Sequence, residues 1–258
     1  MQIFLSALET GGITPYQIVA RGAPLIWCLM SYYYLTDDMP KAEFVRDNCQ
    51  QLLIDSGAHS FQRGKRVDWV DYTRRYAAFI RRFDRPNVLG YFEMDVDNVV
   101  GVPNVLALRR ILADATDKVI PVWHYNRGLD DFLRMCDRYA GRIVAVTGFQ
   151  NYDIADDDYA MFLKAAHERG CRLHCLGLTR TDIMDRVPFD YTDSSSWKLG
   201  ALFGKVCGRQ VTRACTRERM EDCLFANYRE AVAMQRHYHD KWRGVAPPVG
   251  SQFLVPSS

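Results

Sequence analysis

Several apolar segments of the sequence end in a carboxylate. Carboxylates gathered at one site can serve as general acid, general base and nucleophile. Asp and Gly are also common in turns and helix caps, so each carboxylate taken singly has a structural explanation. The carboxylates are Asp55 in QLLIDSG, Glu93, Asp95 and Asp97 in YFEMDVD, and Asp190 and Asp193 in FDYTDS.

The segments that must position these residues alternate between strand-like runs and helical patterns. The strands are nearly continuously apolar, which is typical of a parallel sheet that is buried on both faces. Seven or eight βα units predict an α/β fold, a single (β/α)8 TIM-type barrel with a long C-terminal helix over about 217–242. An open doubly wound sheet is the alternative, but no Gly-rich phosphate loop follows the first strand. The strand-like runs are QIFLSAL, LIWCLMSYYYL, QLLID, VLGYFEMDV, KVIPVWHY, RIVAVTGF, RLHCLGLT and FDYTDS, and the other helical patterns cover 69–83, 105–115, 129–139 and 157–169.

The 258 residues, 48% of them hydrophobic and 25% charged, suit one soluble barrel. We predict a catalytic barrel over residues 1–245 and an extended tail over 246–258. No apolar run reaches the roughly 18 residues of a membrane span. The start lacks the basic region of a signal peptide, so the eight scattered cysteines indicate reduced thiols and a cytoplasmic location.

A barrel gathers residues from the carboxyl ends of its strands into one cup. His124 ends VIPVWHY, Gly148 and Gln150 end VAVTGFQ, and Gly177 ends LHCLG. We therefore expect these residues to meet the strand-end carboxylates.

The segment DSGAHSFQ is similar to the DSGGFQ motif of the tRNA-guanine transglycosylases. The later segment LHCLGLTRTDIMDRVPFDYTDSSSWKLG resembles the region of that family in which a strand carries two aspartates three residues apart. Between them, YFEMDVD, VIPVWHYNRG and VAVTGFQ stand in the order of the family's FDE, VQGG and IGGL segments. The resemblance covers roughly residues 50–200 and is strongest to the compact, phage-type DNA-guanine transglycosylases of the queuine/archaeosine superfamily. A phage-encoded member would act in the host cytoplasm.

The resemblance implies replacement of guanine in nucleic acid by a 7-deazaguanine base, such as the 7-cyano form preQ0, without an organic cofactor. Asp193 matches the nucleophile and Asp55 the acid/base carboxylate of the family. Asp95 matches the base-recognition aspartate, with Asp97 as the alternative register. The remaining residues expected around the substrate are Ser56, Gly57, His59, His124, Gly148, Gln150 and Gly177.

The sequence also departs from the tRNA enzymes. Their CxCxxC zinc motif is absent, and the spacing of Cys207, Cys215, Cys223 and His237 is not that of a zinc knuckle, so we predict no metal. Ser194 and Ser195 replace a Cys-Val pair. We expect a chain of 258 residues to be too short for the extra RNA-binding domains that some members of the family carry, which favours DNA over tRNA.

Basic residues follow both aspartate motifs. Because phosphates attract such clusters, we expect nucleic-acid contacts there. A separate arginine cluster over 74–85 has helical spacing and is expected to form a solvated outer face. The predicted nucleic-acid contacts are Lys198, Lys205, Arg209, Arg213, Arg63 and Lys65.

Two other functions remain open from the sequence. A barrel hydrolase or N-glycosidase would let water resolve the intermediate and leave an abasic site. A non-catalytic subunit would instead partner an active chain. A homodimer or a complex with a partner protein is compatible with either function.

Overall fold

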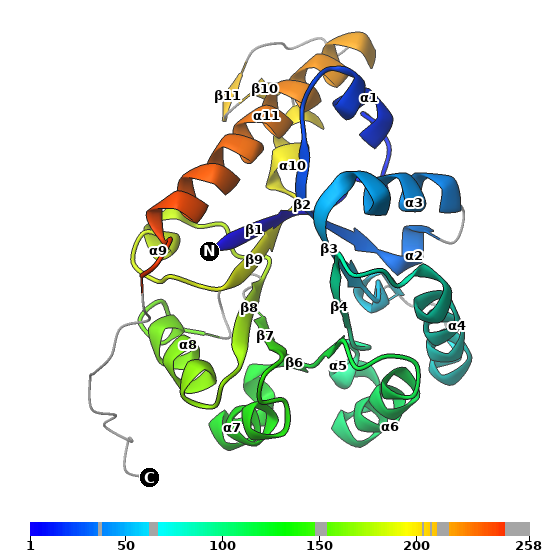
Figure 1. Ribbon diagram of the computed structural model, residues 1–258, viewed down its shortest axis with the longest axis vertical. Helices are drawn as coiled ribbons and strands as arrows, with labels where there is room; N and C mark the ends of the chain where they lie inside the picture. The colour runs from blue at the N-terminus through cyan, green and yellow to red at the C-terminus, as the bar shows by residue number, and fades with distance from the viewer. Residues whose placement is uncertain are drawn as a thin grey trace.

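The computed structural model describes residues 1–35, 38–61, 67–147, 154–202, 204–206, 208–210 and 217–245. Its main sheet is a ring of parallel strands surrounded by helices (Figure 1). The order around the ring is β5-β4-β3-β2-β1-β9-β8-β7-β6. The strands are β1 (Gln2–Leu5), β2 (Leu25–Ser31), β3 (Cys49–Asp55), β4 (Val88–Phe92), β5 (Val119–Ile120), β6 (Val122–Trp123), β7 (Ile143–Thr147), β8 (Arg172–Leu176) and β9 (Tyr191–Ser194).

The ring closes where Pro121 separates β5 from β6. Proline has no N–H to donate, so the hydrogen-bond ladder is interrupted at Pro121 and one strand is divided into two short halves. Its carbonyl still accepts a hydrogen bond of 2.9 Å from the N–H of Ala145 in β7, and Ile120 accepts one of 3.0 Å from the N–H of Glu93. With β5 and β6 as halves of one strand, the nine strands form an eight-membered barrel, so the predicted TIM-type fold is confirmed.

The longer helices lie close to their predicted ranges, and the shorter ones are additions. The run LIWCLMSYYYL does not remain a strand throughout, because α2 begins directly after Ser31. The predicted helices are α4 (Trp69–Phe83), α6 (Val102–Ala113), α7 (Leu129–Arg138), α8 (Tyr159–Glu168) and α11 (Arg217–Lys241). The additional elements are α1 (Pro15–Ala20), α2 (Tyr32–Leu35), α3 (Met39–Asn48), α5 (Asp97–Val100), α9 (Thr181–Met184), α10 (Ser196–Leu202), the 3-10 helices η1 (Ala58–Phe61) and η2 (Tyr125–Arg127), and the hairpin β10 (Lys205–Val206) with β11 (Arg209–Gln210).

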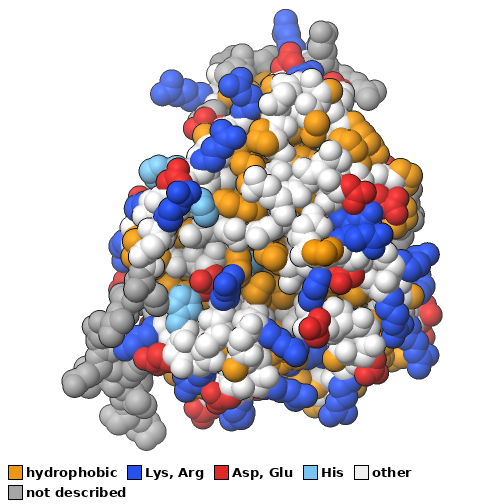
Figure 2. Space-filling model, viewed as in Figure 1, with side chains coloured by type: hydrophobic (Ala, Val, Ile, Leu, Met, Phe, Trp, Pro, Cys, Tyr) orange, Lys and Arg blue, Asp and Glu red, His pale blue; other side chains and the backbone are white. Residues whose placement is uncertain are grey.

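Helix α4 shows how the outer layer is built. Asp68 caps its first turn by accepting a hydrogen bond of 3.0 Å from the N–H of Asp71. One face buries aromatic residues against the barrel, and the opposite face exposes arginines, as expected. Figure 2 shows several Lys and Arg side chains in blue along the right-hand edge of the molecule, the side on which α4 lies in Figure 1. The exposed arginines of α4 are Arg74, Arg75, Arg81 and Arg82, and the exposed Arg85 follows the end of the helix.

The long helix α11 packs across the outside of β1 and β2. The fully buried amide of Gln235 donates to the carbonyls of Ile3 at 2.6 Å and Trp27 at 2.9 Å, which joins the helix to both strands. Among the described residues, no helix is long and apolar enough to cross a membrane. The predicted tail, 246–258, lies outside the described residues.

Candidate active site

Asp55 stands at the carboxyl end of β3, at the mouth of the barrel. Burial is the main cause that raises the pKa of Asp55 to about 7, followed by the negative charge of Asp95. A hydrogen bond of 3.2 Å from the N–H of Gly57 opposes the rise, while the charges of Asp193 and Glu9 add to it. The carboxyl groups of Asp95, Asp193 and Glu9 therefore lie around Asp55.

Gly57 is needed for packing beside this carboxylate. Its φ is +72°, and a Cβ there would lie 2.4 Å from Cβ of Tyr33 and 2.7 Å from Oγ of Ser31. We expected Gly57 to let the backbone approach a ligand, but the close approach is to the end of β2 and the start of α2. The glycine of the DSG motif thus fixes the turn that carries Asp55.

The neighbours of Gly57 in the motif have different positions. Ser56 is fully buried, and its carbonyl accepts a hydrogen bond of 2.7 Å from the hydroxyl of Tyr72. Its role in the structure is therefore to anchor the turn to α4. His59 belongs to η1, and its side chain is outside the described part of the chain. Gly148 and Gln150 also lie outside the described residues.

Asp193 stands near the end of β9 and is held from β8. Its Oδ1 accepts hydrogen bonds from Nε2 of His174 at 3.0 Å and from the N–H of Gly177 at 2.9 Å. Gly177, which we placed against the substrate, has φ +69° and instead turns its N–H toward the carboxylate. The sequence therefore located Asp193 correctly at the mouth but did not identify its two donors.

The serines after Asp193 organise the start of α10. The hydroxyl of Thr179 donates to Oγ of Ser194 at 3.0 Å, and Oγ of Ser194 donates to Oγ of Ser196 at 2.8 Å. The N–H of Ser196 also donates to Oγ of Ser194 at 3.0 Å. Ser194 therefore connects the turn after β8 to α10.

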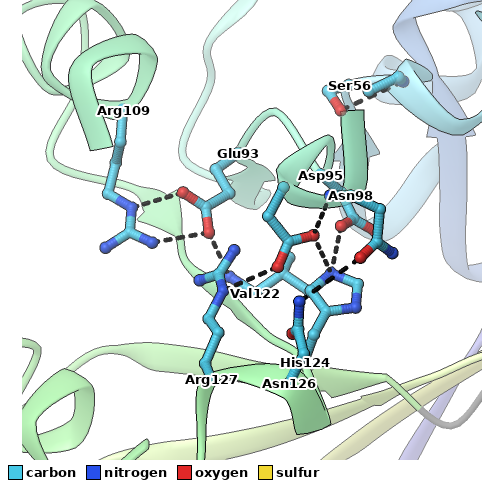
Figure 3. A network of polar contacts seen from close by, with 11 residues as sticks. Ser56, Glu93, Asp95, Asn98, Arg109, Val122, His124, Asn126 and Arg127 are labelled. Carbon is cyan, nitrogen blue, oxygen red and sulfur yellow. Dashed lines mark hydrogen bonds and ion pairs between the residues drawn. The ribbon is translucent and has the colours of Figure 1, made fainter. Parts of the chain in front are cut away.

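A second polar group lies on the neighbouring strands β4 and β6 (Figure 3). Nε2 of His124 is hydrogen-bonded to Oδ1 of Asp95 and lies 3.6 Å from Oδ1 of Asp97. Burial lowers the pKa of His124, but the hydrogen bond and the charges of the two aspartates outweigh it, so the pKa is raised. Asp97 in turn accepts a hydrogen bond of 3.0 Å from Nε of Arg127.

These three residues could also hold a metal ion. One ligand atom from each of Asp95, Asp97 and His124 lies within 4.8 Å of the others. Oxygen and imidazole ligands suit several divalent ions. However, the guanidinium of Arg127 already places positive charge on the almost fully buried Asp97 side chain. We therefore interpret the group as a hydrogen-bonding surface that faces the same mouth as Asp55.

Two of the carboxylates singled out in the sequence, Glu93 and Asp190, are bound by protein groups and stabilise the fold. Glu93 is fully buried, forms a two-point ion pair with Arg109 and accepts a hydrogen bond of 2.7 Å from the N–H of Val122 (Figure 3). Asp190 lies at the start of β9, at the opposite end from the mouth, and is bound by His167 at 2.6 Å and by the N–H of Leu173 at 2.8 Å.

Glu9 was not singled out in the sequence, although it lies beside Asp55. It follows β1 in a loop, and its Oε1 accepts a hydrogen bond of 3.1 Å from the N–H of Ser31. Burial raises the pKa of Glu9, and the charges of Lys198 and Lys41 partly oppose this rise. A single glutamate four residues after a short strand gave no signal, because the loop has no recognisable pattern.

The predicted nucleic-acid residues divide between surface and interior. Lys198 is buried and donates to the carbonyls of Ala7 at 3.0 Å and Thr10 at 2.5 Å, so it braces the loop after β1 rather than facing a phosphate. Burial lowers the pKa of Lys198 to about 8. Lys205 and Arg209 are exposed on the β10–β11 hairpin. Arg63, Lys65 and Arg213 lie outside the described residues.

The cysteine and histidine residues of the C-terminal region do not form one ligand set. Cys223 is buried, and both it and His237 belong to α11. A rise of 1.5 Å per residue over the 14 residues from 223 to 237 separates them by roughly 21 Å along the helix. They cannot bind the same ion, and Cys207 and Cys215 lie outside the described residues.

A cavity of about 640 Å³ lies outside the barrel, between α9, α10 and α11. Its polar groups include Asp185, which is already bound by Lys241 at 2.5 Å and by the hydroxyl of Tyr238 at 3.1 Å. The carboxyl groups that raise the pKa of Asp55 lie instead at the barrel mouth. We therefore place the chemistry at the barrel mouth.

Comparison with known proteins adds little to this site. No family model matches the sequence, and no curated protein matches it. One solved structure, of a protein from Burkholderia cenocepacia J2315 called a "putative lyase/mutase", matches at 15% sequence identity with a TM-score of 0.42. That match covers 81% of this chain and 94% of the other. A similarity this low says nothing about the reaction, which has to be argued from the residues at the mouth.

Proposed function

We propose that the protein is a guanine transglycosylase that exchanges guanine in nucleic acid, DNA in preference to tRNA, for a 7-deazaguanine base. The observation that carries the proposal is the pairing of two aspartates at one barrel mouth. Asp55 has a pKa of about 7, and Asp193 is held by two neutral donors, His174 and the N–H of Gly177. Two carboxyl groups in different environments can divide the roles of acid and nucleophile.

In the first step, a carboxylate oxygen of Asp193 attacks the anomeric carbon of the target nucleotide. The bond from this carbon to the purine nitrogen breaks, and its electron pair stays with the leaving base. Asp55 in its protonated form gives the base a proton. The product is a glycosyl ester on Asp193, formed as in retaining glycosidases.

The second step runs the same exchange in reverse with another base. Asp55, now a carboxylate, removes a proton from a ring nitrogen of the incoming 7-deazaguanine. That nitrogen attacks the anomeric carbon, and Asp193 leaves as a carboxylate. A pKa of about 7 suits Asp55 for both roles, because both of its protonation states are populated near neutral pH.

Asp95 and His124 supply base recognition in this proposal. A purine that has left its stack presents N–H donors on its Watson–Crick edge, and a carboxylate accepts them. The hydrogen bond from His124 fixes the orientation of Asp95 at the mouth. Because Asp95 acts so strongly on the pKa of Asp55, the bound base would lie directly beside its proton donor.

The preference for DNA depends on the sequence. The given sequence does not contain the zinc motif of the tRNA enzymes. The exposed Lys205 and Arg209 offer two phosphate contacts on a hairpin that follows α10, the helix next to Asp193 along the chain. A preference for DNA would follow if this surface determines which nucleic acid binds.

The deciding experiment is base exchange. Purified protein is incubated with DNA or tRNA that carries labelled guanine, together with a 7-deazaguanine base, and the nucleosides are identified by mass. We expect 7-deazaguanine in the DNA, lost in Asp193→Asn and retained in Asp190→Asn, whose side chain lies at the opposite end of the same strand.

Each other result supports a different function. Modification of tRNA alone would show that tRNA, not DNA, is the substrate, and it would still support the base-exchange reaction. Release of free guanine with an abasic site would indicate an N-glycosidase. Exchange that occurs only with an added second protein, and that persists in Asp193→Asn, would indicate a non-catalytic subunit.

A further inference from the structure

His174 occupies an unusual position for an ionisable residue. It lies in β8, fully buried in the barrel interior. Its ring packs against Phe92 with centroids 5.0 Å apart, against Phe4 at 6.3 Å and against Tyr191 at 6.4 Å. An imidazole in such an apolar enclosure must be either neutral or paired with a charge.

The hydrogen bonds define which form of the ring is present. Nε2 lies 3.0 Å from Oδ1 of Asp193, a carboxylate oxygen that can only accept, so Nε2 carries the proton. Nδ1 is buried and has no hydrogen-bond partner among the described residues. A second proton on Nδ1 would be a buried donor without an acceptor, which is costly. We therefore assign the ring proton to Nε2, which donates it to Oδ1 of Asp193.

The two oxygens of Asp193 differ as a consequence. Oδ1 accepts from both His174 and the N–H of Gly177, whereas no described residue donates to Oδ2. About 13% of the Asp193 side chain is exposed, and the mouth lies at this end of β9. Neutral donors on one oxygen orient the carboxylate without neutralising it, and they leave the lone pairs of the other oxygen free.

We propose that His174 is a positioning residue that holds Asp193 through Oδ1 so that Oδ2 is the attacking atom. The inference rests on the proposed function. In the step concerned, the bond from Oδ2 to the anomeric carbon forms, the bond from that carbon to the base breaks, and the proton for the base comes from Asp55. His174 neither gives nor receives a proton.

The alternative is that His174 only fills the barrel interior. A packing role would be preserved by an apolar residue of similar size, and a positioning role would not. The test therefore compares His174→Met, which keeps volume and loses the donor, with His174→Gln, whose amide nitrogen can reach the place of Nε2. Both are measured beside the wild-type chain.

We expect His174→Met to lower the single-turnover rate of base exchange by about 10- to 100-fold, the usual effect of losing a hydrogen bond to a charged group. The affinity for target DNA should stay unchanged, because His174 is fully buried. His174→Gln should recover most of the rate. A folded His174→Met with the wild-type rate, or equal rates for the two variants, would overturn the proposal.

A second measurement does not depend on activity or on the variants folding. Long-range proton–nitrogen correlation spectra of the imidazole distinguish the neutral form with the proton on Nε2 from the other forms. We expect that form for His174 in the wild-type chain. A proton on Nδ1, or a charged ring, would refute the arrangement. If the wild-type chain showed no base exchange, the proposed function would fail while this measurement still decided the His174–Asp193 contact.

Discussion

The negative charge of Asp95 raises the pKa of Asp55 more than the charge of any other residue does. The two residues follow neighbouring parallel strands, β3 and β4, so the barrel presents both at the same end. The pKa of Asp55 therefore depends on what binds to Asp95. A base that donates hydrogen bonds to Asp95 would offset its charge and act directly on the adjacent proton donor.

Replacement of Asp95 should move the pH dependence of the first chemical step. The protonated form of Asp55 is the donor, so the single-turnover rate should fall as pH rises above about 7. Asp95→Asn removes the nearby charge and lowers the pKa of Asp55, so the falling limb should begin at lower pH. Asp97→Asn is the control, because Asp97 is not among the charges that raise the pKa of Asp55. A limb that stays in place in Asp95→Asn would contradict this coupling.

Asp55 should also reduce stability at alkaline pH. Its folded pKa of about 7 lies above the ordinary value of 3.8, so the folded chain binds more protons between these values. Stability therefore falls as pH rises through this window, by up to about 4 kcal/mol from one group. Asp55→Asn removes the cost of ionising this buried group. In urea unfolding, the free energy of unfolding of the variant should therefore exceed that of the wild type by more at pH 8 than at pH 5. Asp157→Asn, with a side chain 93% exposed, is the control, and an equal gain at both pH values in Asp55→Asn would refute the assignment.

Most of the fold followed from hydrophobic periodicity. The barrel strands are buried on both faces, so continuous apolar runs marked most of them, whereas the FDYTDS segment of β9 gave a weaker pattern. Helix α4 was predicted with its observed bounds. The elements that were missed have weak local patterns. α3 depends on its Asp38 cap and Pro40 more than on an amphipathic face, and the run after Ser31 became α2 although its residues also suit a strand.

The candidate site was predictable only where residues share a strand end. Asp55, Asp95 and Asp193 met this condition. His174 did not, because it sits within β8 and its importance comes from the cross-strand contact with Asp193. Lys198 was misread because charge alone does not reveal burial, and its ammonium group is satisfied by the loop after β1. Tertiary contacts of this kind leave no spacing pattern in the sequence.

The exposed hairpin residues should contribute to DNA affinity in a salt-dependent way. Lys205→Glu and Arg209→Glu should each weaken binding, and each should reduce the slope of log affinity against log salt by roughly 0.9 if one phosphate contact is lost. The measurement is a fluorescence anisotropy titration with a DNA oligonucleotide at several salt concentrations. Arg82→Glu, on the outer face of α4, is the matched control. Equal losses in all three variants would indicate attraction to net charge rather than a binding surface on the hairpin.

Removal of divalent metal ions should leave base exchange unchanged. Asp95, Asp97 and His124 are close enough to share an ion, so the prediction concerns a real alternative. Nε of Arg127 lies 3.0 Å from Asp97, and His124 is hydrogen-bonded to Asp95. Each of the three candidate ligands therefore already has a partner within the protein. An added ion would have to compete with the guanidinium for Asp97. We expect equal single-turnover rates before and after treatment with EDTA, and no increase on adding magnesium, manganese or zinc. A loss that one of these ions restores, and that is absent in His124→Gln, would instead identify the three residues as a metal site and remove Asp95 from base recognition.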